Sequence, residues 1–277
     1  INLFSSPSDD LVEQALWTIG NVIGDSPQYR DLIINQYGII DHLLAIDCLT
    51  KPISFLRTEV WVIVNLVRCK TPQISLENIQ KLIPRIVELL NTHDNTIKIG
   101  ALWALTYIAD CSEEYIQTVI ECGVVTTIVP LLSSHRYRLM LAAMRVLGNV
   151  ATGTDAQTDV LLTNDILIHI RFPLMHHKEN LRRMALWCLS NITVGTQDQV
   201  QAVFHSGLLN RIIEGLARPD LKTCKEALYT ISNMITSGSL DDAMDIINAG
   251  AVDPLVQLMM TNDIPIVTAA IHALKSL

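Results

Sequence analysis

Large side chains and asparagines recur along the chain at nearly constant spacing, and both residue types suit the binding of a peptide. Trp17, Trp61 and Trp103 are separated by steps of 44 and 42 residues. Further steps of 42 residues lead through Arg145 to Trp187 and then to Tyr229. Residues four apart share one face of a helix. Five of these six large residues are followed four positions later by an asparagine: Asn21, Asn65, Asn149, Asn191 and Asn233.

A row of amides on otherwise apolar helices indicates a groove rather than a core. Burying an amide without partners costs roughly 1–3 kcal/mol, so we expect the asparagines to face solvent. An amide has one acceptor oxygen and two donor hydrogens, and one amide per repeat would bond both C=O and N–H groups of an extended peptide. Slots between successive indoles would accept a Lys or Arg stem, with a cation–π attraction of ~0.5–2 kcal/mol.

Acidic residues near the large side chains predict a cationic ligand. Asp25, Asp110, Asp155 and Glu226 lie within a few turns of Trp17, Trp103, Arg145 and Tyr229 respectively, and residues 1–50 contain seven acids and one base. The whole chain has 20 Lys and Arg against 28 Asp and Glu, a net charge of −8. A negative groove attracts basic peptides and repels nucleic acid. The expected ligand is a basic, extended segment, and no nucleic acid is expected as a partner.

The elements that position these residues are predicted to be helices in a repeat of about 42 residues. Gly38, Gly123, Gly207 and Gly250 precede apolar stretches, where a positive φ would join one helix to the next. Polar breaks with N-cap chemistry, such as Thr196 with Gln199 and Ser239 with Asp242, separate the repeats. Each repeat therefore reads as a short helix, a turn and two longer apolar helices, which is typical of an all-α solenoid of the armadillo or HEAT class. The predicted repeats are 1–26 (partial), 27–70, 71–112, 113–154, 155–196, 197–238 and 239–277 (partial).

The composition argues against several other classes of protein. Hydrophobic residues make up 49% of the chain, which is ample for a core, while no apolar run reaches the ~18 residues of a membrane span. The six cysteines form no C-x-x-C pair and are expected to be core residues in a reducing compartment. Phosphate-loop, dinucleotide-binding, nucleophile-elbow and zinc-protease motifs are absent, so no enzyme activity, cofactor or metal is expected. His176 and His177 are interpreted as a solvated turn between helices.

The repeats resemble those of importin-alpha (karyopherin-alpha), the adaptor that carries nuclear localisation signals. The resemblance covers nearly the whole chain and assigns the six segments to the third through eighth armadillo repeats of that family. It implies a right-handed superhelical armadillo solenoid of about six to seven repeats that shuttles between cytoplasm and nucleus. The segments are 12–27 (VEQALWTIGNVIGDSP), 65–72 (NLVRCKTP), 103–110 (WALTYIAD), 145–155 (RVLGNVATGTD), 186–193 (LWCLSNIT) and 225–233 (KEALYTISN).

The same resemblance implies two peptide sites for basic nuclear localisation signals. In the larger, partly present site, Asp25 would bond the lysine that most signals require. The chain begins with Ile rather than Met, and we expect a fragment that lacks both the segment for importin-beta and the last repeat, which recruits the export factor. The larger site comprises Gln14, Trp17, Asn21, Asp25, Trp61, Asn65, Trp103 and Asp110. The smaller site comprises Arg145, Asn149, Thr152, Asp155, Thr158, Trp187, Ser190, Asn191, Glu226, Tyr229 and Asn233.

Four departures from the family pattern indicate a divergent paralogue. Gly100 and Met184 stand where the family has acids, Tyr229 replaces a Trp and Thr58 replaces an Asn, which would weaken or re-tune basic recognition, most of all at the smaller site. Two alternatives stay open. One is a degenerate adaptor that binds a folded partner through its outer helices. The other is an armadillo scaffold or adhesion protein of the beta-catenin group, whose basic groove takes acidic ligands; its cations would be Arg68, Lys70, Arg136, Arg138, Arg145, Arg182 and Arg183.

Overall fold

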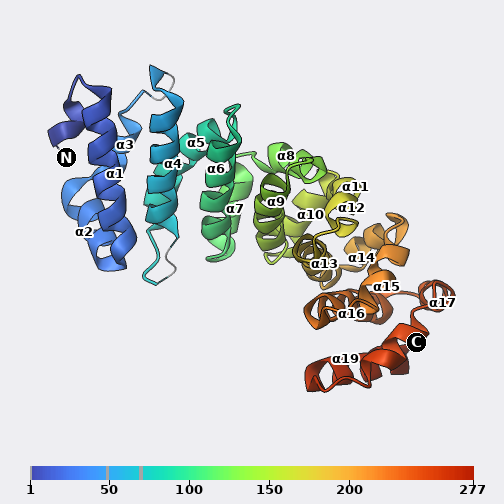
Figure 1. Ribbon diagram of the computed structural model, residues 1–277. Coiled ribbons are helices and arrows are strands. Elements are labelled where there is room, and N and C mark those ends of the chain that lie inside the picture. The colour runs from blue at the N-terminus through green and yellow to red at the C-terminus, as the bar shows by residue number, and fades with distance from the viewer. Residues whose placement is uncertain (1, 48–49, 69–70) are drawn as a thin grey trace. The chain divides into compact units, whose positions relative to one another are not determined.

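The computed structural model describes residues 2–47, 50–68 and 71–277, and helices are the only regular secondary structure in these ranges (Figure 1). The chain divides into two compact units, residues 1–124 and 125–277, which are described separately. Three residues discussed above, Cys48, Cys69 and Lys70, lie outside the described ranges. The all-helical class predicted from the sequence is therefore confirmed.

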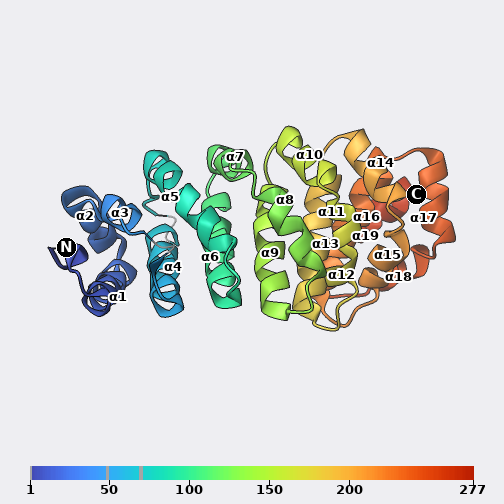
Figure 2. The same ribbon diagram turned by 90° about the horizontal axis from the view of Figure 1, so that it is seen from above.

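The first unit is a two-layered stack of helices. Figure 2 shows α1, α4 and α6 side by side in one layer, with α2, α5 and α7 along the other side. Fully buried aliphatic side chains such as Leu16, Ile63, Ile86 and Leu102 fill the core of this unit. The elements are η1 (Asn2–Ser5), α1 (Asp9–Asp25), α2 (Pro27–Tyr37), α3 (Ile39–Leu44), α4 (Ile53–Val67), α5 (Leu76–Leu90), α6 (Asn95–Ala109) and α7 (Glu113–Glu121).

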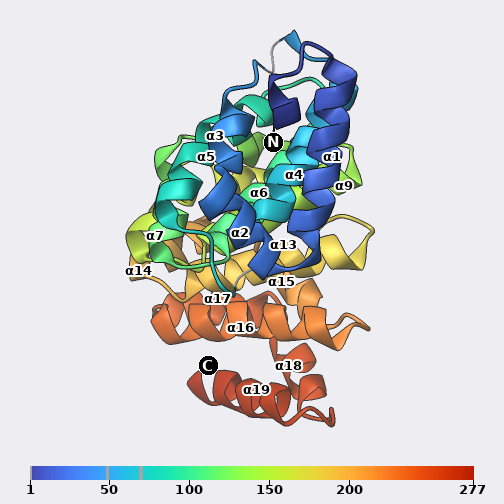
Figure 3. The same cartoon turned by 90° about the vertical axis from the view of Figure 1, so that its left-hand side faces the viewer.

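The second unit repeats a pattern of one short helix, one or two very short pieces and one long helix. The long helices α9, α13, α16 and α19 each pack against the next, and Figure 3 shows α16 and α19 lying side by side. The elements are α8 (Val125–Ile128), η3 (Val129–Ser133), α9 (Tyr137–Val150), α10 (Asp155–Thr163), α11 (Ile166–His169), α12 (Arg171–Leu174), α13 (Glu179–Thr193), α14 (Gln197–His205), α15 (Leu209–Leu216), α16 (Leu221–Ser237), α17 (Leu240–Asn248), α18 (Val252–Leu258) and α19 (Ile264–Ser276).

The first helix of each repeat starts at the polar break that the sequence indicates. Thr196 accepts from the backbone N–H of Gln199, whose side chain accepts from the Thr196 N–H. Ser239 and Asp242 form the same reciprocal pair at the start of α17. Such capping boxes satisfy backbone donors that a helix leaves free at its N-terminus. The predicted N-cap chemistry is thus confirmed at both positions.

The turn after each short helix is set by one residue with a positive φ. Gly38, Gly123, Gly207 and Gly250 all have φ between 58° and 86°, as predicted. Asp165 occupies the equivalent turn before α11 with a φ of 60°. Aspartate is among the few residues other than glycine that visit this region, and its side chain gave no distinguishing signal in the sequence.

Two details differ from the predicted repeat of one short and two long helices. The second helix is short in both units, as in α3, α15 and α18, which have 6, 8 and 7 residues. Before α9 and α13, where Pro130 and Pro173 remove backbone donors, it is divided into two shorter pieces. In residues 71–112, by contrast, α5 continues without a break through Gln80, where the repeat spacing would place the turn residue. With no glycine or aspartate there, nothing favours a positive φ, so the helix does not end.

No single helix in the described part of the chain is long and apolar enough to cross a bilayer, although the bent pair Glu113–Glu121 and Val125–Ser133 meets the length and composition criteria jointly. Among the described residues, no group of three or more His, Cys, Asp or Glu could hold a metal ion. His176 and His177 stack on each other in the turn before α13, as the interpretation of a turn requires.

Candidate functional site

The long helices carry the predicted peptide-binding residues on neighbouring elements within each unit. In the first unit, Trp17 and Asn21 lie on α1, Trp61 and Asn65 on α4, and Trp103 on α6. The contacts between α1 and α4 and between α4 and α6 bring these residues into one row. In the second unit, α9, α13 and α16 form the corresponding row with Arg145, Asn149, Trp187, Ser190, Asn191, Glu226, Tyr229 and Asn233.

The aromatic side chains lie at the surface, and two of the indoles pack against glycines of the preceding long helix. Trp17 is 54% exposed, and Trp61, Trp103, Trp187 and Tyr229 are half-buried. A Cβ atom at Gly20 would lie 2.4 Å from Cζ3 of Trp61, and one at Gly148 would lie 2.3 Å from Cζ3 of Trp187. These two glycines therefore let an indole lie directly on the backbone of the preceding long helix, a role that the sequence reading missed. Their position, three residues after Trp17 and Arg145, was the signal available for it.

The asparagine amides are more engaged within the chain than the sequence predicts. Asn65 is only 4% exposed and donates from Nδ2 to the Gly20 carbonyl at 3.1 Å, while Asn149 is also buried, at 7% exposed. Asn233 donates to the Ser190 carbonyl at 3.2 Å and to Thr193 Oγ1 at 3.3 Å.

Asn65 and Asn149 are thus buried where solvent exposure was expected, and the bonding of the asparagines to peptide C=O and N–H groups stays a prediction. Burying an unpaired donor is costly, so Nδ2 bonds to the preceding long helix instead. No described residue donates to Oδ1 of Asn65 or Asn233, nor to Oδ1 of the exposed Asn21, whose Nδ2 donates to the Trp17 carbonyl. At Asn21 and Asn65 a second Nδ2 hydrogen and the Oδ1 acceptor are left for a peptide, whereas Asn233 uses Nδ2 twice within the chain and keeps Oδ1.

The charged and polar residues of the larger predicted site lie within α1 and at the C-terminal ends of α1 and α6. Gln14, Asp25 and Asp110 are exposed, and Asp25 and Asp110 stand at the C-terminal ends of their helices. The Arg68 guanidinium donates to the carbonyl of Gly24, the neighbour of Asp25. A cation of the chain is therefore bound to the backbone of the residue next to Asp25, the residue that was predicted to bind lysine.

An apolar slot opens between the long helices α4 and α6. It has a volume of about 380 Å³. Two of the predicted residues, Trp61 and Trp103, form part of its wall, as the prediction of a slot between successive indoles requires. The lining residues are Arg57, Val60, Trp61, Val64, Thr96, Ile99, Gly100, Trp103 and Tyr107.

Four residues of the smaller predicted site line one pocket between α9, α10 and α13. These are Thr152, Asp155, Thr158 and Asn191, in a cavity of about 180 Å³. Asp155 and Thr152 are exposed, while the Asn191 Nδ2 atom is buried and finds no hydrogen-bond partner among the described residues. A buried donor without a partner raises the free energy of the unliganded protein by ~1–3 kcal/mol. The pocket thus offers a carboxylate and an unused amide donor at one place.

The other end of the smaller site is partly occupied by the chain itself. The Lys225 ammonium lies 5.6 Å from the centre of the Tyr229 ring, the distance range of a cation–π contact. Ser190 donates to Glu226 Oε2 at 3.4 Å, and burial raises the pKa of Glu226 despite the attraction of Lys225 and Arg183. Sequence reasoning missed Lys225, although its position one helical turn before Tyr229 places both on one face.

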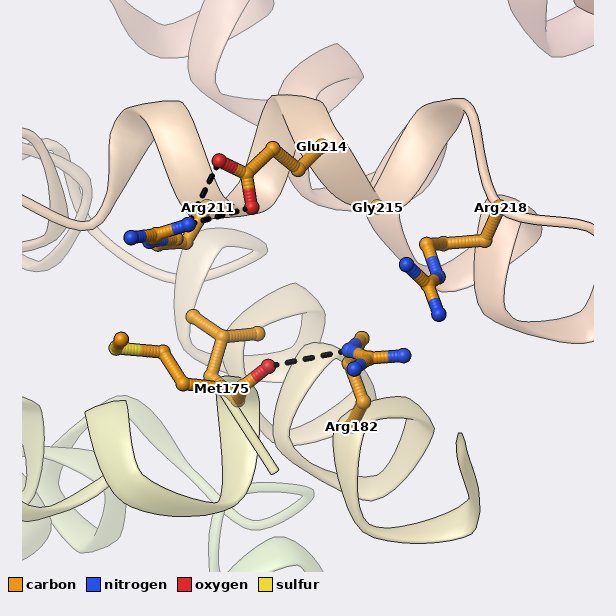
Figure 4. Close-up of a pocket in the computed structure, with 7 residues that line it drawn as sticks. Met175, Arg182, Arg211, Glu214, Gly215 and Arg218 are labelled. Carbon is orange, nitrogen blue, oxygen red and sulfur yellow. Dashed lines mark hydrogen bonds and ion pairs between the residues drawn. The ribbon is translucent and has the colours of Figure 1, made fainter. Parts of the chain in front are cut away.

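Three arginines surround a separate pocket of about 170 Å³ in the second unit, away from the predicted residues (Figure 4). Arg211 binds both oxygens of Glu214 at 2.8 Å, and Arg218 binds Glu179 at 3.1 Å. Arg182, one of the cations named for an acidic ligand, donates to the His176 carbonyl at 2.7 Å and also to the Leu174 carbonyl. Each guanidinium is thus bound to a group of the chain, and this pocket contains none of the predicted site residues.

Comparison with known proteins agrees with the helical repeat. The armadillo/beta-catenin-like repeat matches residues 71–110. Importin subunit alpha-2 of Arabidopsis thaliana is 39% identical over 124 residues, which are 45% of this chain and 23% of that protein. Importin subunit alpha-3 of Caenorhabditis elegans is 42% identical over 102 residues, which are 37% of this chain and 20% of that protein. The match therefore spans about a quarter or less of each of these relatives.

Solved structures with the same fold cover nearly the whole chain. An engineered protein, target OR497, has a TM-score of 0.88 at 22% identity, over 99% of this chain and 66% of that chain. The designed armadillo repeat protein YIII(Dq)4CqI has a TM-score of 0.68 at 20% identity, over 100% of this chain and 97% of that chain. A related design, YIII(Dq.V1)4CPAF, has a TM-score of 0.67 at 21% identity, over 99% of this chain and 96% of that chain, and was solved in complex with peptide (KR)4. The chain has an armadillo-repeat fold and is similar in sequence to importin subunits alpha.

Proposed function

We propose that this chain binds basic nuclear localisation signals as extended peptides and acts as a nuclear import adaptor. The observation that carries the proposal is the pocket of Thr152, Asp155, Thr158 and Asn191, which combines an exposed carboxylate with a buried amide donor that no described residue accepts from. An extended peptide supplies what these groups need, because its carbonyls accept from the amide and its lysine or arginine side chains bind the carboxylate.

The aromatic row supports the same ligand class. Surface indoles over Gly20 and Gly148 and the acceptor oxygens of Asn21, Asn65 and Asn233 provide stacking surfaces and backbone contacts at one set per repeat. The similarity to importin subunits alpha and the (KR)4 peptide in a designed armadillo protein of the same fold agree with this ligand class. In the import role, the partners would further include importin-beta and an export factor, with shuttling between cytoplasm and nucleus.

The direct test is a binding titration with a fluorescent lysine-rich peptide and, separately, with an acidic peptide of equal length. We expect the lysine-rich peptide to bind with micromolar or tighter affinity and to weaken as salt rises, because exposed charge pairs are screened. Tighter binding of the acidic peptide would contradict the proposal and favour a scaffold of the beta-catenin type.

Charge-reversal variants locate the binding site. Asp155→Lys should weaken the lysine-rich peptide about tenfold through loss of a charge-assisted bond and added repulsion. Asp198→Lys is the matched control, since Asp198 is exposed in the first turn of α14 and lines none of the pockets described above. Equal weakening by both variants would mean that only net charge matters and would remove the pocket from the proposal.

A further inference from the structure

The slot between α4 and α6 has a different chemistry from the pocket at Asp155, and this difference bears on which peptide binds. None of its described lining residues carries a carboxylate. Asp94 is bound to two of the lining residues, Arg57 and Thr96: its Oδ2 accepts from Arg57 Nη2 at 2.6 Å, and its Oδ1 accepts from the Thr96 and Ile97 N–H groups at 2.9 and 3.0 Å. These bonds hold the pKa of Asp94 below its ordinary value.

The remaining carboxylate of this part of α4 is directed elsewhere. Glu59 is fully buried and binds Arg85 of α5 at 2.8 Å. A lysine ammonium in the slot would therefore lose hydration without gaining a counter-ion, and it would lie near the Arg57 cation. The free energy lost by removing water from an unpaired ammonium is larger than the free energy gained from its cation–π attraction to the indoles.

Gly100 and Val60 together exclude an acid from the slot wall. A Cβ atom at Gly100 would lie 2.8 Å from both methyl groups of Val60, and Val60 is 3% exposed. An acidic side chain at position 100 would have to displace a packed valine. The close packing of α4 against α6 at Gly100 and Val60 therefore prevents a carboxylate side chain at position 100.

We propose that this slot accepts an aliphatic side chain of the bound peptide in place of a lysine or arginine. The inference rests on the proposed function, because it assumes that an extended peptide lies along the long helices. The apolar wall of Val60, Trp61, Val64, Ile99 and Trp103 matches such a side chain, and its burial is favourable by the hydrophobic effect. The preferred ligand of this chain is then a basic segment interrupted by one aliphatic residue.

Norleucine supplies the matched probe, since it keeps most of the lysine stem and removes the ammonium group. Each lysine of the lysine-rich peptide is replaced singly by norleucine, and the Kd of each peptide is measured by fluorescence anisotropy. We expect one position at which norleucine binds about fivefold tighter than lysine, and weaker binding at the positions next to carboxylates. Preference for lysine at every position would overturn the inference while leaving the proposed function intact.

Two variants of the slot identify the position. Ile99 is half-buried in the wall, so Ile99→Glu adds a carboxylate without removing a core side chain, and Ile99→Gln is its uncharged control. Ile99→Glu should switch that one peptide position to a preference for lysine, and Ile99→Gln should keep the preference for norleucine. An unchanged profile in Ile99→Glu would place the aliphatic residue outside this slot. If no peptide of the series binds the unmodified chain, the proposed function fails and this inference fails with it.

Discussion

At the scale of single residues, the candidate site contains groups that compete with its ligand. Lys225 stands over the ring of Tyr229, and Arg68 binds the carbonyl beside Asp25. A cationic ligand at these positions would share or displace these contacts, which contribute ~0.5–2 kcal/mol for an ammonium over an aromatic ring and ~1.5–3 kcal/mol for a hydrogen bond from a charged group.

Removing the internal cation should strengthen the smaller site. We expect Lys225→Ala to tighten binding of the lysine-rich peptide about two- to fivefold, because the ring face is freed and one repulsive charge is lost. Lys222→Ala is the matched control: Lys222 is exposed on the same helix and has no ring contact among the described residues. Equal tightening by both variants in an anisotropy titration would assign the effect to net charge alone.

A buried carboxylate in the first unit makes stability depend on pH. Burial raises the pKa of Glu59 from 4.5 to about 7, even though Arg85 favours the ionised form. Between these values the unfolded chain has lost the proton and the folded chain retains it, so stability falls as pH rises through this window and is constant outside it.

We therefore expect the unmodified chain to lose up to about 3 kcal/mol relative to Glu59→Gln between pH 4.5 and pH 7.5. Denaturant unfolding of both proteins at the two pH values gives this difference, in which other titrating groups cancel. A difference that does not change with pH would show that the Glu59 pKa is the same in the folded and unfolded chains.

At the scale of elements, the positive-φ turn before α11 is the place where local structure is strained. Asp165 has a φ of 60°, a region that costs a residue other than glycine roughly 1–2 kcal/mol. Asp165→Gly should raise the unfolding temperature by a few degrees, since relief of this strain outweighs the added flexibility of the unfolded chain. Asp165→Ala should lower it. The opposite order in a thermal scan would mean that the aspartate side chain stabilises the turn.

Sequence periodicity predicts these elements well, because glycine turns and N-caps are local signals. The turns at Gly38, Gly123, Gly207 and Gly250 and the caps at Thr196 and Ser239 follow from the residues themselves. The turn at Asp165 lies 42 residues after Gly123 and 42 before Gly207, so the spacing locates it although the residue type does not.

The candidate site could be predicted only in part. The sequence reading names Thr152, Asp155, Thr158 and Asn191, and they line one pocket. It does not reveal that Asn65 bonds to Gly20, because the partner is a backbone carbonyl on a helix 45 residues away. Nor does residue type reveal that Trp61 lies on Gly20, since this contact depends on how closely α1 and α4 approach.

At the scale of the whole molecule, negative charge is concentrated in the first unit. Residues 1–124 contain 15 acids and 8 bases, whereas residues 125–277 contain 13 acids and 12 bases. The field that attracts a cationic peptide therefore comes mostly from the first unit, and contacts in the second unit depend more on local geometry.

This asymmetry predicts different salt dependence for the two halves. In the Asp155→Lys variant, the remaining binding occurs through the first unit and should weaken steeply as salt is raised from low to physiological concentration. In the Asp25→Lys variant, the remaining binding occurs through the second unit and should change less. Titrations of both variants at three salt concentrations give the two slopes, and equal slopes would contradict the assignment.

The bonds from Asn65 to Gly20 and from Asn233 to Ser190 have a consequence for how such a surface can evolve. Each amide forms a hydrogen bond between one long helix and the preceding one, and its oxygen is available to a ligand. A mutation there would therefore lower stability and change ligand binding together. New ligand preferences are more readily acquired at positions that join no helices, and the half-buried Ile99 in the slot wall is one of them. A lineage of such repeats would thus retain its asparagines and diversify in the spaces between the indoles.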